Sequence, residues 1–122
     1  MAYKILVVDD EPHIVMMLEA RLRKNGFEVV TATSGSEAMA KVKQDRPDLI
    51  VLDVMMPVIS GLEVCRMLKE NPATQAIPVI LLTAKSTERD QTLGISAGAD
   101  SYVTKPYTPE ELLGQIKELL ER

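Results

Sequence analysis

Acidic, lysine and hydroxyl side chains stand directly after short apolar runs of this sequence, and their chemistry suggests a cation site. Asp9 and Asp10 follow the first run, Asp53 follows the third, and Thr83 and Lys105 follow the last two. Three carboxylates brought together repel one another, so at least one of them has a raised pKa. With Lys105 counted as positive, these groups carry a formal charge of −2, which one divalent cation would cancel.

The ligand types favour a hard cation and a phosphoryl group bound beside it. Oxygen ligands alone, without a cysteine or histidine set, predict Mg²⁺, with Mn²⁺ as the alternative, and several bound waters. Lys105 would neutralise the oxygens of a phosphoryl group, and Thr83 would donate a hydrogen bond to it. Asp53, which stands alone after its run, is the best candidate nucleophile and would form an aspartyl-phosphate.

Five short runs rich in Val, Ile and Leu predict the strands that must position these groups. The first, third and fourth lack an alternation of polar and apolar residues, which is typical of parallel strands covered on both faces. The five predicted strands are Tyr3–Val8, Phe27–Thr31, Asp48–Leu52, Pro78–Leu82 and Ser101–Thr104.

Helix start and stop signals fill the segments between the runs. A helix that begins near Pro12 should end at Asn25-Gly26, and Ser or Thr caps should start three others. The predicted caps pair Ser34 with Glu37, Ser60 with Glu63, and Thr108 with Glu111. The segment Ser86–Ala97 begins polar and contains Gly94, so we expect a weakly packed fourth helix that is the most mobile one.

This alternation predicts an α/β fold, a (βα)5 doubly wound open parallel sheet with helices on both faces. In such sheets ligands bind outside the carboxyl ends of the strands, where the candidate residues fall. No linker or repeat interrupts the pattern, so residues 1–122 are expected to form one domain.

The composition limits which kinds of function the chain can have. With 46% hydrophobic and 26% charged residues the chain reads as an ordinary globular domain, and its net charge of −4 argues against direct nucleic-acid binding through a basic surface. A single cysteine, Cys65, excludes an internal disulfide and fits a cytoplasmic setting. No apolar run suggests a signal peptide or a membrane span.

Motifs spread over essentially the whole chain resemble the receiver domain of two-component response regulators, of the single-receiver type found in chemotaxis. They are VVDDE (Val7–Glu11), LDVMMP (Leu52–Pro57), LLTA (Leu81–Ala84) and GADSYVTKP (Gly98–Pro106). The resemblance implies a flavodoxin-like strand order of 2-1-3-4-5. It also implies a phosphorelay switch, rather than an enzyme with other substrates, that catalyses only its own phosphorylation and dephosphorylation.

The resemblance further implies a role for each matching residue. Asp53 would take phosphate from a histidine kinase or a histidine phosphotransfer protein. The Mg²⁺ ligands would be Asp10, Asp53, the Met55 carbonyl and, largely through water, Asp9. Lys105, in a cis bond to Pro106, would contact the phosphoryl oxygens. Thr83 and Tyr102 would be the coupled switch residues.

The same resemblance suggests an output. Phosphorylation would shift the face formed by the fourth helix, the fifth strand and the fifth helix, where an effector, an output domain or a second copy of the chain would dock. One local departure lies at Val58-Ile59, two β-branched residues expected to be exposed where many members carry glycine and a polar residue.

Two other function classes fit parts of the pattern. A Mg²⁺-dependent phosphohydrolase with an Asp nucleophile would need an acid two residues after Asp53, where this chain has Met55. A flavodoxin-like FMN binder would need a glycine- and hydroxyl-rich loop after the first strand, where Asp9 and Asp10 would repel a phosphate. Structural roles are expected for several other residues. Methionines 16, 17, 55, 56 and 67 should fill the core, and Cys65 should be a small core residue. His13 should lie where a helix begins.

Overall fold

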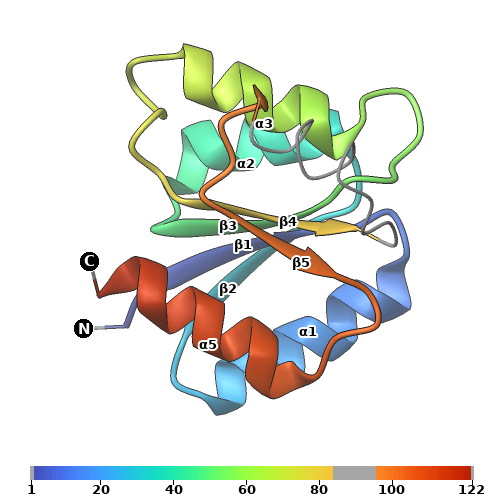
Figure 1. Ribbon diagram of the computed structural model, residues 1–122, viewed down its shortest axis with the longest axis vertical. Coiled ribbons are helices and arrows are strands. Elements are labelled where there is room, and N and C mark those ends of the chain that lie inside the picture. Colours follow the sequence, from blue (N-terminus) through green and yellow to red (C-terminus); the bar gives the residue numbers. More distant parts are fainter. Residues whose placement is uncertain (1, 84–95, 122) are drawn as a thin grey trace.

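The computed structural model describes residues 2–83 and 96–121 of the chain (Figure 1). Its strands are β1 (Lys4–Val8), β2 (Glu28–Ala32), β3 (Leu49–Asp53), β4 (Val79–Thr83) and β5 (Ser101–Thr104). Its helices are α1 (Pro12–Lys24), α2 (Gly35–Asp45), α3 (Gly61–Glu70) and α5 (Pro109–Leu120). The predicted fourth helix and its expected mobility fall almost wholly outside the described residues.

The five strands form one parallel sheet in the order β2-β1-β3-β4-β5, which confirms the predicted fold class and strand order. Figure 1 shows α1 and α5 on one face of the sheet and α2 and α3 on the other. Right-handed crossovers between parallel strands place helices on both faces in this way. Among the described helices, none has the length and apolar character needed to cross a membrane.

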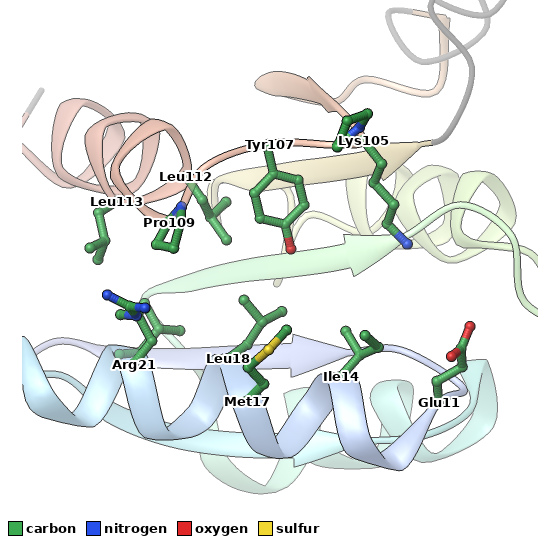
Figure 2. A pocket seen from close by; sticks show the side chains of 12 residues that line it. Glu11, Ile14, Met17, Leu18, Arg21, Lys105, Tyr107, Pro109, Leu112 and Leu113 are labelled. Atoms are coloured by element: carbon green, nitrogen blue, oxygen red, sulfur yellow. The ribbon is translucent and has the colours of Figure 1, made fainter.

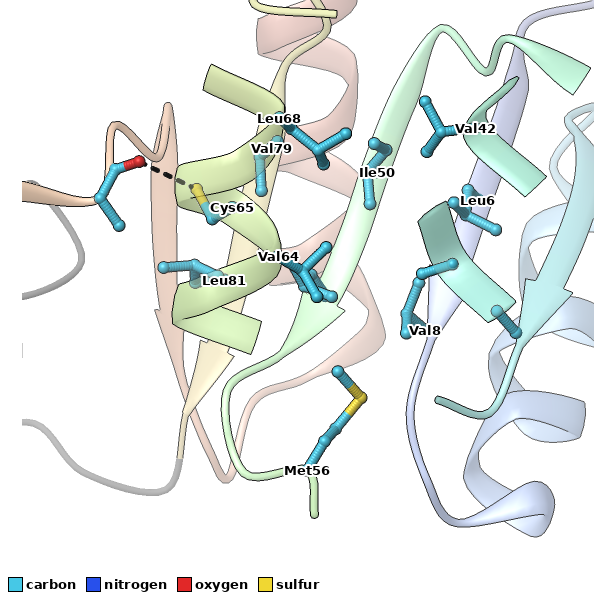
Figure 3. Close-up of a cluster of buried hydrophobic side chains, with 14 residues drawn as sticks. Leu6, Val8, Val42, Ile50, Met56, Val64, Cys65, Leu68, Val79 and Leu81 are labelled. Atoms are coloured by element: carbon cyan, nitrogen blue, oxygen red, sulfur yellow. Dashed lines mark hydrogen bonds between the residues drawn. The ribbon is translucent and has the colours of Figure 1, made fainter. Parts of the chain in front are cut away.

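Each strand supplies side chains to both faces of the sheet, because successive residues of a strand point in opposite directions. On β1, Leu6 and Val8 pack under α2 and α3, whereas Ile5 and Val7 pack under α1 and α5. Figure 3 shows the first of these clusters, in which the Cys65 thiol donates to the carbonyl of Ala97. Burial on both faces explains why the central strands are apolar throughout.

The predicted cap residues begin helices α2, α3 and α5 as expected. The side chains of Ser34, Ser60 and Thr108 each accept a hydrogen bond from the backbone N–H three residues later. Such a bond satisfies one of the free N–H groups of a first helical turn. At its other end α1 stops at Asn25, and Gly26 follows with a φ of 89°, the left-handed conformation that glycine adopts freely.

The structure corrects two expectations about packing. Met16, Met17, Met55 and Met67 are exposed, and only Met56 of the predicted core methionines is buried. On α1 the buried residues are Val15, Leu18 and Leu22, so Met16 and Met17 lie on the exposed side of the helix. The strand bounds also differ by one residue in places, so that Asp53 and Thr83 end their strands instead of following them.

Candidate functional site

The register of the sheet brings the predicted carboxylates together. Val8 of β1 is aligned with Leu52 of β3. The next residues, Asp9 and Asp53, are therefore neighbours at the carboxyl edge of the sheet. One carboxylate oxygen from each of Asp9, Asp10 and Asp53 lies within 4.8 Å of the other two, in an arrangement that could hold a metal ion.

Lys105 reaches this group from the end of β5. Its backbone N–H donates to the carbonyl of Thr83 over 2.6 Å, which holds the segment after β5 against the end of β4. Its ammonium Nζ lies 3.3 Å from Oδ1 of Asp53 and 3.9 Å from Oδ2 of Asp9. The peptide bond from Lys105 to Pro106 is cis, as the family resemblance implied.

Burial dominates the electrostatics of the two central carboxylates. Asp9 is only 2% exposed and Asp53 only 4%. Loss of water raises the pKa of Asp53, while the Lys105 ammonium and the backbone N–H of Met55 act in the opposite direction. Burial likewise raises the pKa of Asp9, against a hydrogen bond from the backbone N–H of Glu11. Both carboxylates have thus lost most of their water, and the nearby lysine and backbone N–H groups offset only part of that cost.

One oxygen of the site fits a metal ion in particular. Oδ2 of Asp9 is buried and has no hydrogen-bond partner among the described residues. The nearest cation among the described residues, the ammonium of Lys105, is 3.9 Å away, which is too far for a hydrogen bond. A buried carboxylate oxygen without a partner is costly, and coordination of a cation would satisfy it. The donor set is oxygen only, which suits Mg²⁺ or Mn²⁺.

The connection from β3 to α3 folds back against the acceptor strand. The backbone N–H of Gly61 donates to the carbonyl of Val54 over 3.0 Å. A methyl group at Gly61 would fall on the carbonyl oxygen of Asp53 and lie 2.9 Å from the Cα of Val54. Only glycine allows this close approach, so the tight packing holds the end of β3 in place.

Val58, in the same connection, has a strained backbone. Its φ of 67° lies in the left-handed region, and the N–H of Ile59 donates to the carbonyl of Pro57 over 2.8 Å. This is a γ-turn with positive φ at its central residue, a rare and strained form. For a β-branched residue the cost is about 1–3 kcal/mol. The expectation that Ile59 is exposed is wrong, because it packs against Gly35 at the start of α2.

A groove of about 540 Å³ runs between α1 and α5 and begins at the site (Figure 2). Glu11 and Lys105 stand at one end, and Tyr107 extends from the segment before α5 into the space between the helices. Burial raises the pKa of the Tyr107 hydroxyl, and the negative charges of Asp9 and Asp53 add to the shift. Sequence reasoning missed Tyr107, although its place two residues after Lys105 was a usable signal.

The other predicted site residues, Thr83, Tyr102 and Met55, lie on or directly after the strands. Thr83 is buried at the end of β4, and Tyr102 is partly exposed on β5, where it lines a hollow with Glu111 and Gln115. Met55 has an exposed side chain, and its backbone N–H acts to lower the pKa of Asp53. The switch role of Thr83 and Tyr102 and the metal contact of the Met55 carbonyl stay predictions.

Known proteins are similar to this chain in sequence and in fold. A family model described as the response regulator receiver domain matches residues 5–117. The chain is 47% identical over 119 residues to the alkaline phosphatase synthesis transcriptional regulatory protein PhoP of Bacillus subtilis, covering 98% of this chain and 49% of that protein. It is 43% identical over 122 residues to the DNA-binding response regulator MtrA of Mycolicibacterium smegmatis, covering 100% of this chain and 52% of the relative.

A solved structure extends the likeness to a smaller protein. The chemotaxis protein CheY4 of Vibrio cholerae superposes with a TM-score of 0.92 at 34% identity, covering 98% of this chain and 99% of that one. The chain therefore spans about half the length of the curated relatives that it matches, but nearly all of this chemotaxis protein.

Proposed function

Because the chain belongs to the response-regulator receiver domain family, a family of signalling domains, we propose that Asp53 is its phosphoryl acceptor. The observation that carries this proposal is the placement of the Lys105 ammonium, 3.3 Å from Oδ1 of Asp53, beside a cluster of three carboxylates. Asp53 is the member of that cluster that ends a central strand and lies closest to the lysine.

The transfer would use the groups already assembled. An oxygen of the Asp53 carboxylate attacks the phosphorus of a phosphohistidine, a P–O bond forms, and the P–N bond to the imidazole breaks. The departing imidazole nitrogen keeps the bonding pair and takes up a proton from solvent. Lys105 and a hydrogen bond from Thr83 offset charge on the phosphoryl oxygens. Asp9 and Asp10 would hold Mg²⁺ with Asp53, and that ion would supply further neutralisation of the phosphoryl oxygens.

The proposed partners follow from this chemistry. The donor is a histidine kinase or a histidine phosphotransfer protein, and the chain catalyses only its own phosphorylation and dephosphorylation. The face that includes β5 and α5 would then control an effector, an output domain or a second copy of the chain. A cytoplasmic location completes this proposal, since it is where such donors would meet the chain.

Nucleic-acid binding is a property of one of the relatives. The printed name of one relative describes it as DNA-binding, and this chain matches 52% of that protein. The expectation that the present chain makes no direct contact with nucleic acid is not supported by these comparisons and stays a prediction. It rests only on the net charge of −4.

Substitution of the acceptor tests the proposal. With Mg²⁺ and a small phosphoryl donor such as phosphoramidate, the wild-type chain should gain a phosphoryl group that hydroxylamine removes, as expected for an acyl phosphate. Asp53→Asn should abolish the labelling, because an amide is not a nucleophile for phosphorus. It should also abolish the donor-dependent shifts of the Thr83 and Tyr102 amide resonances that the switch proposal requires.

Asp45→Asn, at the end of α2, is the matched control and should be labelled normally. Normal labelling of the Asp53→Asn variant would refute the assignment. Turnover of a phosphate ester at a rate unchanged by Asp53→Asn would likewise exclude the rival hydrolase with Asp53 as its nucleophile.

A further inference from the structure

Most of the groove between α1 and α5 lies outside the chemistry proposed for Asp53. Its volume of about 540 Å³ falls within the range of about 300–1,000 Å³ that is usual for small-molecule sites. Figure 2 shows apolar side chains of the two helices facing each other across it. The apolar lining includes the buried Leu18, Leu22 and Leu112 and the partly exposed Ile14 and Leu113. An apolar molecule in the groove would remove this surface from water, which is favourable.

One end of the groove carries a positive charge without a partner in the described part of the chain. Arg21 lines the groove from the same face of α1 as Ile14 and Leu18, since residues three, four and seven apart share a helix face. Its guanidinium forms no ion pair or hydrogen bond with any described residue. Figure 2 shows Arg21 at the end opposite Lys105 and Glu11. A carboxylate at Arg21 could accept two parallel hydrogen bonds from the guanidinium.

The other end of the groove is less suited to an anion. The Lys105 ammonium lies 3.3 Å from Oδ1 of Asp53, and Glu11 adds a negative charge at the same end. The negative group of a ligand would therefore lie at Arg21, with its apolar part extending toward Lys105. The helical rise separates residues 11 and 21 by about 15 Å along α1. An extended chain of about ten carbons, with C–C bonds of about 1.5 Å, covers most of that span.

Tyr107 forms an aromatic wall in the middle of the groove. Its side chain is half-buried, and Figure 2 shows it reaching from the segment before α5 into the space between the helices. Its hydroxyl is not hydrogen-bonded to any described residue. Apart from Glu11, every polar side chain among the lining residues can donate a hydrogen bond. This lining favours a ligand that carries acceptor oxygens.

The size of the groove favours a single extended chain over a helix. A helix about 10 Å across and about 15 Å long occupies about 1,200 Å³. That volume is more than twice the volume of the groove, so most of a docked helix would stay outside it.

We propose that the groove between α1 and α5 binds a free small amphiphile, a carboxylate with an unbranched apolar chain of about ten carbons. The carboxylate pairs with the guanidinium of Arg21. The chain lies against Leu18, Leu113 and the ring of Tyr107, where its burial stabilises the complex. This site does not depend on the role proposed for Asp53.

The test compares two amphiphiles of equal chain length and opposite charge on the full chain. Decanoate, kept below the concentration at which it forms micelles, should shift the methyl resonances of Leu18 and Leu113 saturably. We expect a dissociation constant on the order of 0.1–1 mM and nuclear Overhauser contacts between the decanoate chain and the ring of Tyr107. Decyltrimethylammonium should bind at least about tenfold more weakly, because the guanidinium of Arg21 repels its head group.

Two arginine variants separate the proposed head-group contact from a general effect of charge. Arg21→Gln should weaken the binding of decanoate by about tenfold and remove most of the preference over decyltrimethylammonium. Arg66→Gln is the matched control, because Arg66 is also an exposed arginine on a helix but belongs to α3, on the opposite face of the sheet. It should bind decanoate as the wild type does. Both variants should keep normal labelling of Asp53 by phosphoramidate, which shows that they are folded.

Several results would overturn the proposal. One is a dissociation constant for decanoate that Arg21→Gln leaves within twofold of the wild type, and another is equal binding of the two amphiphiles. Association with phosphatidylglycerol vesicles without binding of monomeric decanoate would make the groove a membrane contact. Shifts of the Leu18 and Leu113 methyl groups that follow protein concentration and not decanoate would make it an interface between two copies of the chain. Failure of phosphoramidate to label Asp53 in the wild type would contradict the proposed function alone.

Discussion

Asp9 is a residue whose burial works against the fold at neutral pH. Its carboxylate is 2% exposed, one of its oxygens has no hydrogen-bond partner among the described residues, and burial raises its pKa. A raised pKa in the folded state means that the folded chain holds the proton more tightly than the unfolded chain does. Ionised Asp9 therefore lowers the stability of the metal-free protein.

Replacing Asp9 with asparagine should stabilise the metal-free protein at pH 7 by about 1 kcal/mol. The amide oxygen can still accept the hydrogen bond that Glu11 donates to Oδ1. The wild type regains this stability as the pH falls through the raised folded pKa toward the ordinary value of 3.8, so the difference should shrink over that window. Urea unfolding with EDTA at neutral pH and at about pH 4 measures both values. A variant less stable than the wild type at pH 7 would contradict the argument.

At the scale of elements, Lys69 joins three parts of the chain that are distant in sequence. Its ammonium Nζ, at the end of α3, donates to the carbonyls of Gln75 and Ile77 and lies 2.7 Å from Oδ2 of Asp100. The same Asp100 oxygen accepts the backbone N–H of Val79 at the start of β4. This network links α3 to the beginnings of β4 and β5, on the edge of the sheet opposite the candidate site.

Lys69→Met should lower the free energy of unfolding by about 2 kcal/mol, because it removes the ammonium from two carbonyls and from a partly buried carboxylate that keeps only the Val79 N–H as a donor. The Lys69 side chain is 15% exposed, so solvent screens this ion pair only in part. Lys43→Met, on the exposed part of α2, is the control and should change stability by less than about 0.5 kcal/mol. Chemical denaturation of the wild type and both variants measures the two changes in the free energy of unfolding. Equal stability of the two variants would show that the network is not stabilising. Both variants should still be phosphorylated at Asp53.

At the scale of the whole molecule, the candidate site links the ends of several strands. Asp9 and Asp10 follow β1, Asp53 ends β3, and Lys105 follows β5. A cation bound there would contact only the folded arrangement, because the unfolded chain does not hold these carboxylates together. Its binding free energy therefore adds to the stability of the entire fold.

Mg²⁺ should raise the melting temperature of the wild-type chain at pH 7, and EDTA should reverse the effect. A free concentration of one hundred times the dissociation constant would contribute about 2.7 kcal/mol. The gain should be much smaller in the Asp9→Asn variant, which lacks a ligand charge. It should also be smaller in the wild type at about pH 4, because Asp9 and Asp53, whose pKa values burial raises, bind protons there instead. A melting temperature that Mg²⁺ leaves unchanged at pH 7 would mean that the acidic cluster is not a metal site.

Local residue patterns predicted the elements and the identity of the candidate site residues. Apolar runs without alternation predicted buried parallel strands, and Ser34, Ser60 and Thr108 marked three helix starts. These predictions succeeded because burial period and capping depend on short stretches of chain. The strand order, by contrast, was implied by the family resemblance. The likeness of Asp9, Asp53 and Lys105 to family motifs then identified the candidate site.

Only the tertiary structure decided how these parts face one another. It showed that Oδ2 of Asp9 lacks a partner, that Met17 faces solvent, and that Val58 is held at a positive φ. None of these is encoded in a local pattern, since each follows from the rotation of a helix or the closure of a loop against distant segments. The sequence alone determined which residues reach the carboxyl edge of the sheet. Packing between distant elements determined which of them lack water and a partner, and it is that deprivation that favours a cation.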